Sequence, residues 1–355
     1  RLPPHADGTL PLPLDVPAKG KCFVNICYHC KQDSALIKAD HLLGFDEIPL
    51  QNSDPRNQDA VQLLGRPAGD GLITIRETDR MLVLSCEQFT YVFNKLTGLF
   101  DKMTFANEPL LDQPMGFNVW RAPTDNDRKL KADWYAAHYD HAATNAYHTE
   151  YTVTASGVTL HTHVGIAAIC VQKFLDLDVT WTVANNGSVD LALHAQRNTV
   201  FPELPRFGLR LFLPQEMSQV NYYGMGPMEC YCDKHHAASH NSYTATVWQL
   251  HEDYIRPQEN GSHFDCDYVM LAGDAVRLTA VGTQPFSFNA SHYTQEELTR
   301  KAHNYELEPC SSTVLCLDYA QNGIGSESCG PRLLEQYRLD DATFNFGLRL
   351  FPEKK

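Results

Sequence analysis

Long hydrophobic runs and clusters of basic residues are both missing from this 355-residue sequence. No stretch approaches the ~20 consecutive apolar residues that a membrane-spanning helix requires. The formal net charge is −14, and no long block of Lys and Arg precedes the final Glu353-Lys354-Lys355. Because nucleic-acid binding depends on clustered positive charge, the composition predicts a soluble protein that binds neither a membrane nor nucleic acid.

The usual fingerprints of several enzyme classes are also missing. The sequence has no G-x-S-x-G elbow, no P-loop and no G-x-G-x-x-G dinucleotide motif. The sequence therefore lacks the motifs that commonly indicate acyl transfer, phosphoryl transfer or hydride transfer. The regular alternation of strand and helix that builds a (β/α)₈ barrel is missing as well.

Cysteine is plentiful but lacks the dense spacing of a small disulfide scaffold. Eleven cysteines are scattered over the whole chain, which favours reduced thiols in a cytoplasmic protein. The first twenty residues are rich in proline and have neither the basic nor the apolar region of a signal peptide. We expect the chain to begin partway through a domain.

Apolar residues recur with the period of a β-strand. From Lys21 to Lys31 an apolar residue stands at every second position, and a second strand is expected from Leu42 to Ile48. The alternation persists beyond Gly71, and Asn186-Gly187 between two apolar runs predicts a tight hairpin. The sequence predicts an all-β fold.

One segment is typical of a linker. Residues 51–71 are dense in Asn, Asp, Pro and Gly. This predicts one domain at residues 1–50 and a second at residues 72–355. The first has too few strands to close a sandwich, so we expect its apolar face to pack on a neighbouring element or to stay partly exposed.

Helical patterns are rare. One helix is expected from Lys129 to Ala143, where apolar and aromatic residues recur every four positions. Another is expected to begin at Thr294, whose hydroxyl can cap the helix while the Glu297 carboxylate accepts from the Thr294 amide, an arrangement called a capping box.

Metal sites are poorly supported. Cys27 and Cys30 have C-x-x-C spacing, but residues three apart on a strand point to opposite faces. Residues 125–127 resemble the start of a calcium loop, yet the Gly and Glu needed at its sixth and twelfth positions are missing. We expect Asn126 or Asp127 to cap the following helix instead. The cysteines and histidines from Cys230 to His240 leave a metal-binding module as a weaker alternative.

Three loops, at residues 116–127, 222–233 and 256–261, are dense in glycine, proline and aromatic residues beside amides and carboxylates, a composition that suits sugars. Together with two further loops they give five motifs, which read RAPTDND (121–127), NYYGMGPMECYCD (221–233), YIRPQENG (254–261), FSFNASHYTQEEL (286–298) and GIGSESCGP (323–331). In this order and spacing they resemble the C-terminal region of the large β-galactosidases of glycoside hydrolase family 2, including the small chain found where that enzyme is split. The resemblance runs from about Leu42 to Pro352.

The resemblance implies a fold, and it implies that the catalytic groups lie in a different part of the enzyme. Residues 72–355 would form a large antiparallel β supersandwich of the galactose-mutarotase type, preceded by the last strands of an immunoglobulin-like β sandwich. Retaining glycosidases need two carboxyl groups about 5–5.5 Å apart. In this family both come from a preceding barrel, which also binds the Mg and Na ions that family enzymes often use. No catalytic residue and no cofactor is therefore expected in this chain.

The resemblance also implies partners. The barrel-bearing portion would lie on the same polypeptide or on a separate large chain, and the full enzyme would be an oligomer acting on a galactoside substrate. The isolated chain is expected to be inactive. The alternative is a stand-alone aldose mutarotase or carbohydrate-binding module on the same fold. Mutarotation requires an acid/base pair, typically His and Glu, and no motif here pairs them.

Four residues are expected beside the sugar pocket. In the family the GIGSESCGP loop reaches into the barrel's pocket, so Ser328 and Cys329 would line its wall. Some members have a tryptophan where Cys329 stands. Arg128 and Lys129 begin a segment that resembles a mobile flap beside the same pocket. The Cys329 thiol is expected to be accessible, whereas Cys22 and Cys316 are expected to be buried.

Overall fold

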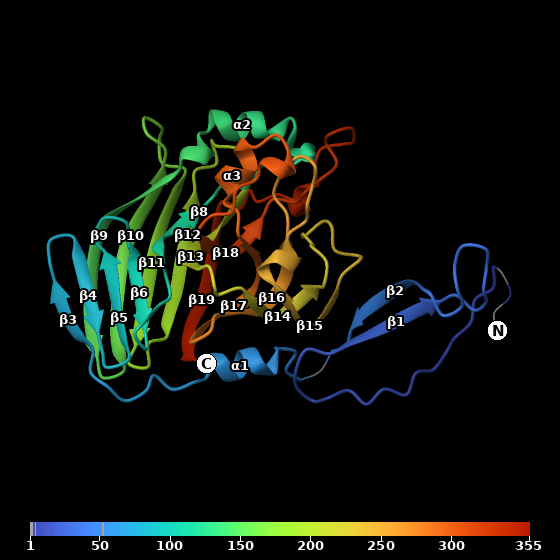
Figure 1. Ribbon diagram of the computed structural model, residues 1–355, viewed down its shortest axis with the longest axis horizontal. Coiled ribbons are helices and arrows are strands. Elements are labelled where there is room, and N and C mark those ends of the chain that lie inside the picture. The colour runs from blue at the N-terminus through green and yellow to red at the C-terminus, as the bar shows by residue number, and fades with distance from the viewer. Residues whose placement is uncertain (1–2, 4, 52) are drawn as a thin grey trace. The chain divides into compact units, whose positions relative to one another are not determined.

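The computed structural model describes residues 3, 5–51 and 53–355 and divides into two compact units, Arg1–Gln62 and Leu63–Lys355. In the first unit, β1 (Phe23–His29) pairs antiparallel with β2 (Leu42–Pro49), so both expected strands are confirmed. A short helix, α1 (Gln58–Leu64), lies within the segment expected as a linker (Figure 1).

The first unit has almost no core of its own. Among its described residues, Ala60 is the single buried hydrophobic side chain. Tyr28 on β1 and Leu43 on β2 are 49% and 60% exposed. Cys22, which was expected to be buried, is only half-buried, because two strands provide no second layer to cover it.

The second unit contains two antiparallel sheets. The smaller follows chain order through five strands: β3 (Thr74–Glu77), β4 (Met81–Ser85), β5 (Phe89–Asn94), β6 (Leu99–Phe105) and β7 (Glu108–Pro109). The larger has twelve strands, and its main path runs β15-β14-β16-β17-β19-β12-β11-β10-β9, with β18, β13 and β8 branching from β17. The all-β prediction with one large antiparallel sheet is confirmed.

The strands of the larger sheet are long and span most of the unit. Their bounds are β8 (Gln113–Asn118), β9 (Ala143–Thr154), β10 (Gly157–Ala167), β11 (Leu175–Ala184), β12 (Val189–Arg197), β13 (Arg206–Pro214), β14 (Gln219–Gly226), β15 (Ser239–Thr246), β16 (Ser262–Ala272), β17 (Val276–Ser291), β18 (Ser312–Gln321) and β19 (Thr343–Lys354).

Aromatic residues join the two sheets. Trp181 on β11 is fully buried, meets Phe100 of β6 edge to face at 5.3 Å, and donates its indole N–H to the Gly98 carbonyl at 2.9 Å. The Tyr91 hydroxyl donates to the Gly187 carbonyl at 2.6 Å. The inward-facing positions of β5, β6 and β11 thus bury large apolar surfaces against each other, which is the main favourable term in folding. Figure 1 shows the small sheet lying beside β9 to β11.

The predicted hairpin between β11 and β12 is confirmed. Gly187 adopts φ +85°, and the Asn186 side chain accepts a hydrogen bond from the Ser188 amide at 2.8 Å. These are the properties for which Asn-Gly is favoured in tight turns.

The helices are short. They are α2 (Leu130–Ala136) and α3 (Gln295–Arg300), with 3₁₀ turns η1 (Asp125–Asp127), η2 (Tyr139–His141), η3 (Val247–Leu250), η4 (Asn304–Glu306) and η5 (Glu335–Tyr337). No helix in the described part of the chain is long and apolar enough to cross a membrane.

Two helix predictions need correction. The helix expected from Lys129 to Ala143 ends at Ala136, because His138 takes a left-handed conformation (φ +57°) that an α-helix cannot contain. At α3 the Thr294 hydroxyl accepts from the Glu297 amide at 3.1 Å, as predicted. The Glu297 carboxylate does not accept a hydrogen bond from the Thr294 amide, because it binds Arg300 and the Glu308 amide instead.

Candidate functional site

A buried arginine joins the first and last of the five loops. The side chain of Arg121 has no exposed surface, and its Nη2 lies 2.7 Å from Oδ1 of Asp127. The same guanidinium donates to the carbonyls of Asn322 and Gly323, the latter at 3.0 Å. A buried guanidinium needs such acceptors, since an unpaired buried charge is very costly. The loop at residues 323–331 therefore has a fixed starting point.

Asp127 pairs with Arg121 and does not cap the following helix. Its carboxylate accepts from the Thr124 amide at 2.8 Å and from the Thr124 hydroxyl at 3.1 Å, and it pairs with Arg121. Helix α2 has no side-chain cap at its first turn. The expectation that Asn126 or Asp127 caps α2 is wrong, because the buried arginine competes for the carboxylate.

A second anchor for the loop comes from Asp233, the last residue of the 221–233 loop. Its carboxylate accepts from the amides of Ile324 and Gly325 at 2.9 and 2.7 Å. Gly325 has φ +66°, which favours glycine, and a Cβ on Gly323 would lie 2.8 Å from Cγ of Asp233. These two positions therefore require glycine.

The tip of the same loop is exposed. Ser328 and Cys329 both face solvent. The Ser328 hydroxyl donates to Oδ1 of Asn126 at 2.8 Å, and Nδ2 of Asn126 donates to the Gly325 carbonyl at 2.7 Å. The Nζ of Lys129 lies 3.7 Å from Oε1 of Glu327. Three of the four expected site residues are thus gathered on two adjoining loops.

The fourth, Arg128, is not tied to the loop. Its side chain is exposed and forms no ion pair within the described residues.

A second buried arginine connects the remaining loops. Arg206 on β13 binds Glu259 at 2.6 Å, Asn289 at 3.0 Å and both carboxylate oxygens of Asp318. Glu259 in turn accepts from the Ala122 amide at 3.1 Å. All five loops therefore meet in one network, although they are dispersed in the sequence.

Sequence reasoning missed Arg206 and Asp318. Both lie on strands outside the five loops, where a charged residue usually indicates a solvent-facing position. In the structure both side chains are fully buried.

A cavity of about 480 Å³ opens beside the base of the 323–331 loop. Its walls include Asn126, Glu229, Asp233, Tyr254, Glu259 and Ile324. Three of these are carboxylates, the kind of group that glycosidases use for catalysis. Their contacts decide whether they are available for that role.

Each of these three carboxylates is already bound to internal donors. Glu229 accepts from Lys234 at 2.7 Å, from the Gly261 amide at 3.0 Å and from the Tyr254 hydroxyl. Burial alone would raise the pKa of Glu229, but these bonds outweigh it and hold the pKa below its ordinary value. A general acid in a glycosidase needs the opposite shift.

One carboxyl group does have a raised pKa. Burial, partly opposed by Arg206, raises the pKa of Asp318 to about 6. Its side chain has no exposed surface, so a substrate cannot reach it. Glu229, Asp233 and Glu259 therefore act as acceptors for donors within the protein.

The region from Cys230 to His240 does not form a metal centre. The Cys230 sulfur is buried and accepts from the Phe264 amide at 3.2 Å, and burial raises the pKa of this thiol to about 11. His240 instead pairs with Asp265 at 2.7 Å. Throughout residues 3, 5–51 and 53–355, no group of three or more His, Cys, Asp or Glu is arranged to hold a metal ion.

Known proteins have sequences similar to that of this chain. The family model described as beta galactosidase small chain matches residues 85–350. A beta-galactosidase from Actinobacillus pleuropneumoniae is 37% identical over 351 residues, covering 99% of this chain and 34% of its own length. A second from Staphylococcus xylosus is 34% identical, covering 98% of this chain and 34% of its own length.

A solved structure was also found. A galactose mutarotase-like protein from Lactobacillus casei aligns with a TM-score of 0.42 at 10% identity, covering 79% of this chain and all of the other. The chain spans about a third of the length of the curated relatives that it matches. The family match covers most of the large β unit and includes all five loops. This chain belongs to the beta-galactosidase small-chain family.

Proposed function

We propose that this chain is the part of a β-galactosidase that completes the sugar pocket and subunit interfaces but supplies no catalytic carboxylate. The full enzyme, a glycoside hydrolase of family 2, would cleave terminal β-D-galactose from lactose-like sugars. Membership of the small-chain family and relatives about three times longer support this proposal.

The observation that carries the proposal is the contrast within the 323–331 loop. Its base is fixed by the buried Arg121 and by Asp233, whereas Ser328 and Cys329 at its tip are exposed. A rigid base with an outward-facing tip suits a loop that contributes to a pocket completed elsewhere, because binding groups must be held in place by their supports.

The non-catalytic role is supported by the carboxylates of the cavity, which bind donors within this chain. Glu229, Asp233 and Glu259 line the cavity beside the loop, and each stabilises the protein itself. The catalytic pair would come from a barrel-bearing portion, on the same polypeptide or a separate chain. The metal ions of the family would be bound there, and the assembled enzyme would be an oligomer.

Two further points belong to the proposal. The eleven cysteines are all free, which favours a cytoplasmic location. The chain would divide into an immunoglobulin-like part at residues 1–50, a linker at 51–71 and the supersandwich at 72–355. Limited proteolysis should cut between residues 51 and 71; resistance there, with cleavage inside the large unit, would contradict this division.

One observation keeps the mutarotase alternative in view. Glu229 and His235 both line a neighbouring cavity of about 480 Å³, and mutarotation uses such a pair. Polarimetry of α-galactose with the purified chain tests it. Rapid mutarotation that is lost in Glu229→Gln would favour the epimerase.

The proposed function is tested by complementation. The barrel-bearing portion of the Actinobacillus pleuropneumoniae relative is mixed with this chain, and hydrolysis of a chromogenic β-galactoside is followed. We expect Cys329→Trp to change KM, because a ring at the tip alters the surface that faces the sugar. The matched control is Cys27→Trp, another exposed thiol. Equal kinetics for both variants would argue against the loop's role in the pocket.

A further inference from the structure

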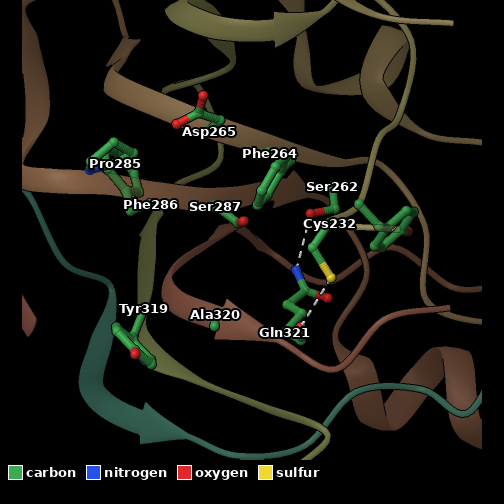
Figure 2. A pocket seen from close by; sticks show the side chains of 11 residues that line it. Cys232, Ser262, Phe264, Asp265, Pro285, Phe286, Ser287, Tyr319, Ala320 and Gln321 are labelled. Atoms are coloured by element: carbon green, nitrogen blue, oxygen red, sulfur yellow. Dashed lines mark hydrogen bonds between the residues drawn. The ribbon is translucent and has the colours of Figure 1, made fainter. Parts of the chain in front are cut away.

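A third cavity, of about 210 Å³, lies within the large sheet between β16, β17 and β18 (Figure 2). It shares only Tyr231 with the cavity beside the 323–331 loop. Cavities of roughly 150 Å³ accommodate a benzene molecule. This one is therefore large enough for a six-membered ring with substituents. Pro285 at its edge is exposed, so the cavity reaches the surface.

Aromatic rings form part of the wall. Tyr319 stacks on Phe344 with ring centroids 4.4 Å apart and an interplanar angle of 9°. One face of Tyr319 is thereby covered and its ring is held in place. Phe264 lies beside His235, with ring centroids 5.8 Å apart and the ring planes tilted by 32°. Figure 2 shows Tyr319 and Phe264 projecting from different strands around the cavity.

Polar groups accompany the rings. Asp265 lies in an irregular part of β16, where the pairing register shifts, and has a left-handed backbone (φ +51°). Such bulges commonly redirect a side chain next to a functional site. His240 holds the Asp265 carboxylate at 2.7 Å. The Ser287 hydroxyl, also on the wall, forms no hydrogen bond within the described residues, and Gln321 is fixed through its Nε2 to Ser262 at 3.0 Å.

The charge of the wall limits the class of ligand. None of the eleven described residues lining the cavity is Lys or Arg, and one is an aspartate. An anionic ligand would meet like charge and no counter-ion, which is unfavourable. A purely apolar ligand would leave the Asp265 carboxylate desolvated, which is costly. A neutral ring with an apolar face and several hydroxyl groups matches both halves of the wall.

We propose that this cavity binds a neutral pyranose sugar. The ring packs against Tyr319 and Phe264, and its hydroxyls bond to Asp265 and Ser287. The ligand is either a free monosaccharide or the terminal residue of an oligosaccharide, since the contacting chemistry is the same. This site lies wholly within the present chain and does not depend on the proposed role of the 323–331 loop.

The test is a titration of the purified chain with methyl β-galactoside, methyl β-glucoside and lactose, followed by saturation-transfer NMR and calorimetry. Hydrolysis is not measured, so failure here is distinct from failure of the proposed function. Saturable binding of at least one sugar is expected. Tightest binding of lactose indicates an oligosaccharide end, and equal binding of the monosaccharides indicates a free sugar; both support the proposal.

Two variants locate the binding. Tyr319→Leu removes the ring but keeps an apolar contact with Phe344, and Asp265→Asn keeps a residue that tolerates the left-handed backbone. Each should weaken binding roughly tenfold, the equivalent of one lost stacking or charged contact. Tyr305→Leu is the control, because Tyr305 is 80% exposed and stacks on His303 outside this cavity.

Thermal unfolding shows whether each variant is folded. If Tyr319→Leu does not fold, the binding of sugar to Asp265→Asn decides the test. The proposal is overturned if no sugar binds saturably at millimolar concentration. It is equally overturned if the folded cavity variants bind as tightly as Tyr305→Leu.

Discussion

The Nη2 atom of Arg121 lies 3.0 Å from the carbonyl oxygen of Gly323, although the two residues are 202 positions apart in the sequence. The same guanidinium is paired with Asp127. One buried charge therefore fixes both the 121–127 loop and the start of the 323–331 loop. The position of the exposed loop tip depends on an interaction that lies entirely inside the protein.

Replacing Arg121 by Met should be strongly destabilising. Asp127 would be left buried without its counter-ion, which typically costs about 3–5 kcal/mol. Urea unfolding measures the loss. Arg128→Met is the matched control, because Arg128 is exposed, and it should change stability by less than about 0.5 kcal/mol. Similar midpoints for the two variants would contradict the anchoring role of Arg121.

Replacing Asp233 by Ala should loosen the loop without unfolding the protein. The amides of Ile324 and Gly325 would lose a charged acceptor, and such bonds contribute about 1.5–3 kcal/mol each. Hydrogen exchange at these two amides should accelerate roughly tenfold or more. Asp125→Ala, at an exposed carboxylate, is the control. Unchanged exchange would show that the loop is held by other contacts.

Alkylation should separate the cysteines into two groups. Cys27, Cys170 and Cys329 are exposed, whereas Cys230, Cys266 and Cys316 are buried. Burial also raises the pKa of Cys316 to about 12, and the thiolate is the reactive form. Iodoacetamide and peptide mapping of the native chain should therefore label the first group and spare the second. A Cys329 that reacts only after unfolding would mean that the loop is a packed corner.

Stability should fall as the pH decreases from 6.5 towards 4, because of His263. This side chain is buried, its Nε2 has no hydrogen-bond partner in the described part of the protein, and burial lowers its pKa to about 4. The unfolded chain, with an ordinary pKa near 6.5, binds the proton first, so acid favours unfolding.

A variant isolates this contribution. Between pH 7 and pH 5 the wild type should lose about 2 kcal/mol more than His263→Phe, by proton linkage. The other histidines are the same in both proteins, so the difference reports His263 alone. His161→Phe, at an exposed position, should behave like the wild type. Parallel pH profiles for the wild type and His263→Phe would show that His263 is not responsible.

The parts of the fold that depend on local periodicity could be predicted. The strands from Phe23 to Pro49 and the Asn186-Gly187 turn follow from alternation and turn chemistry. The five loops of the candidate site were identified from their residue types and order. Helix α2 was predicted too long, because nothing in the local pattern indicates that His138 adopts a left-handed conformation.

The interior of the site could not be predicted in the same way. Arg206 and Asp318 occupy strand positions where charged residues normally face water, and only the tertiary structure places them together in the core. Asp127 was expected at a helix terminus because the local sequence favours a cap. Arg121 binds this carboxylate instead, and the Arg121 side chain is itself held by the carbonyls of Asn322 and Gly323, contacts across the sequence that have no local signature.

We propose that this chain shapes a sugar pocket whose catalytic groups lie elsewhere. The most direct test is hydrolysis of a chromogenic β-galactoside by the purified chain, alone and after mixing with the part of the Actinobacillus pleuropneumoniae relative that this chain does not match. We expect no turnover above the uncatalysed rate for the chain alone and restored turnover in the mixture. Robust hydrolysis by the chain alone, abolished by Glu229→Gln or Asp233→Asn, would contradict it.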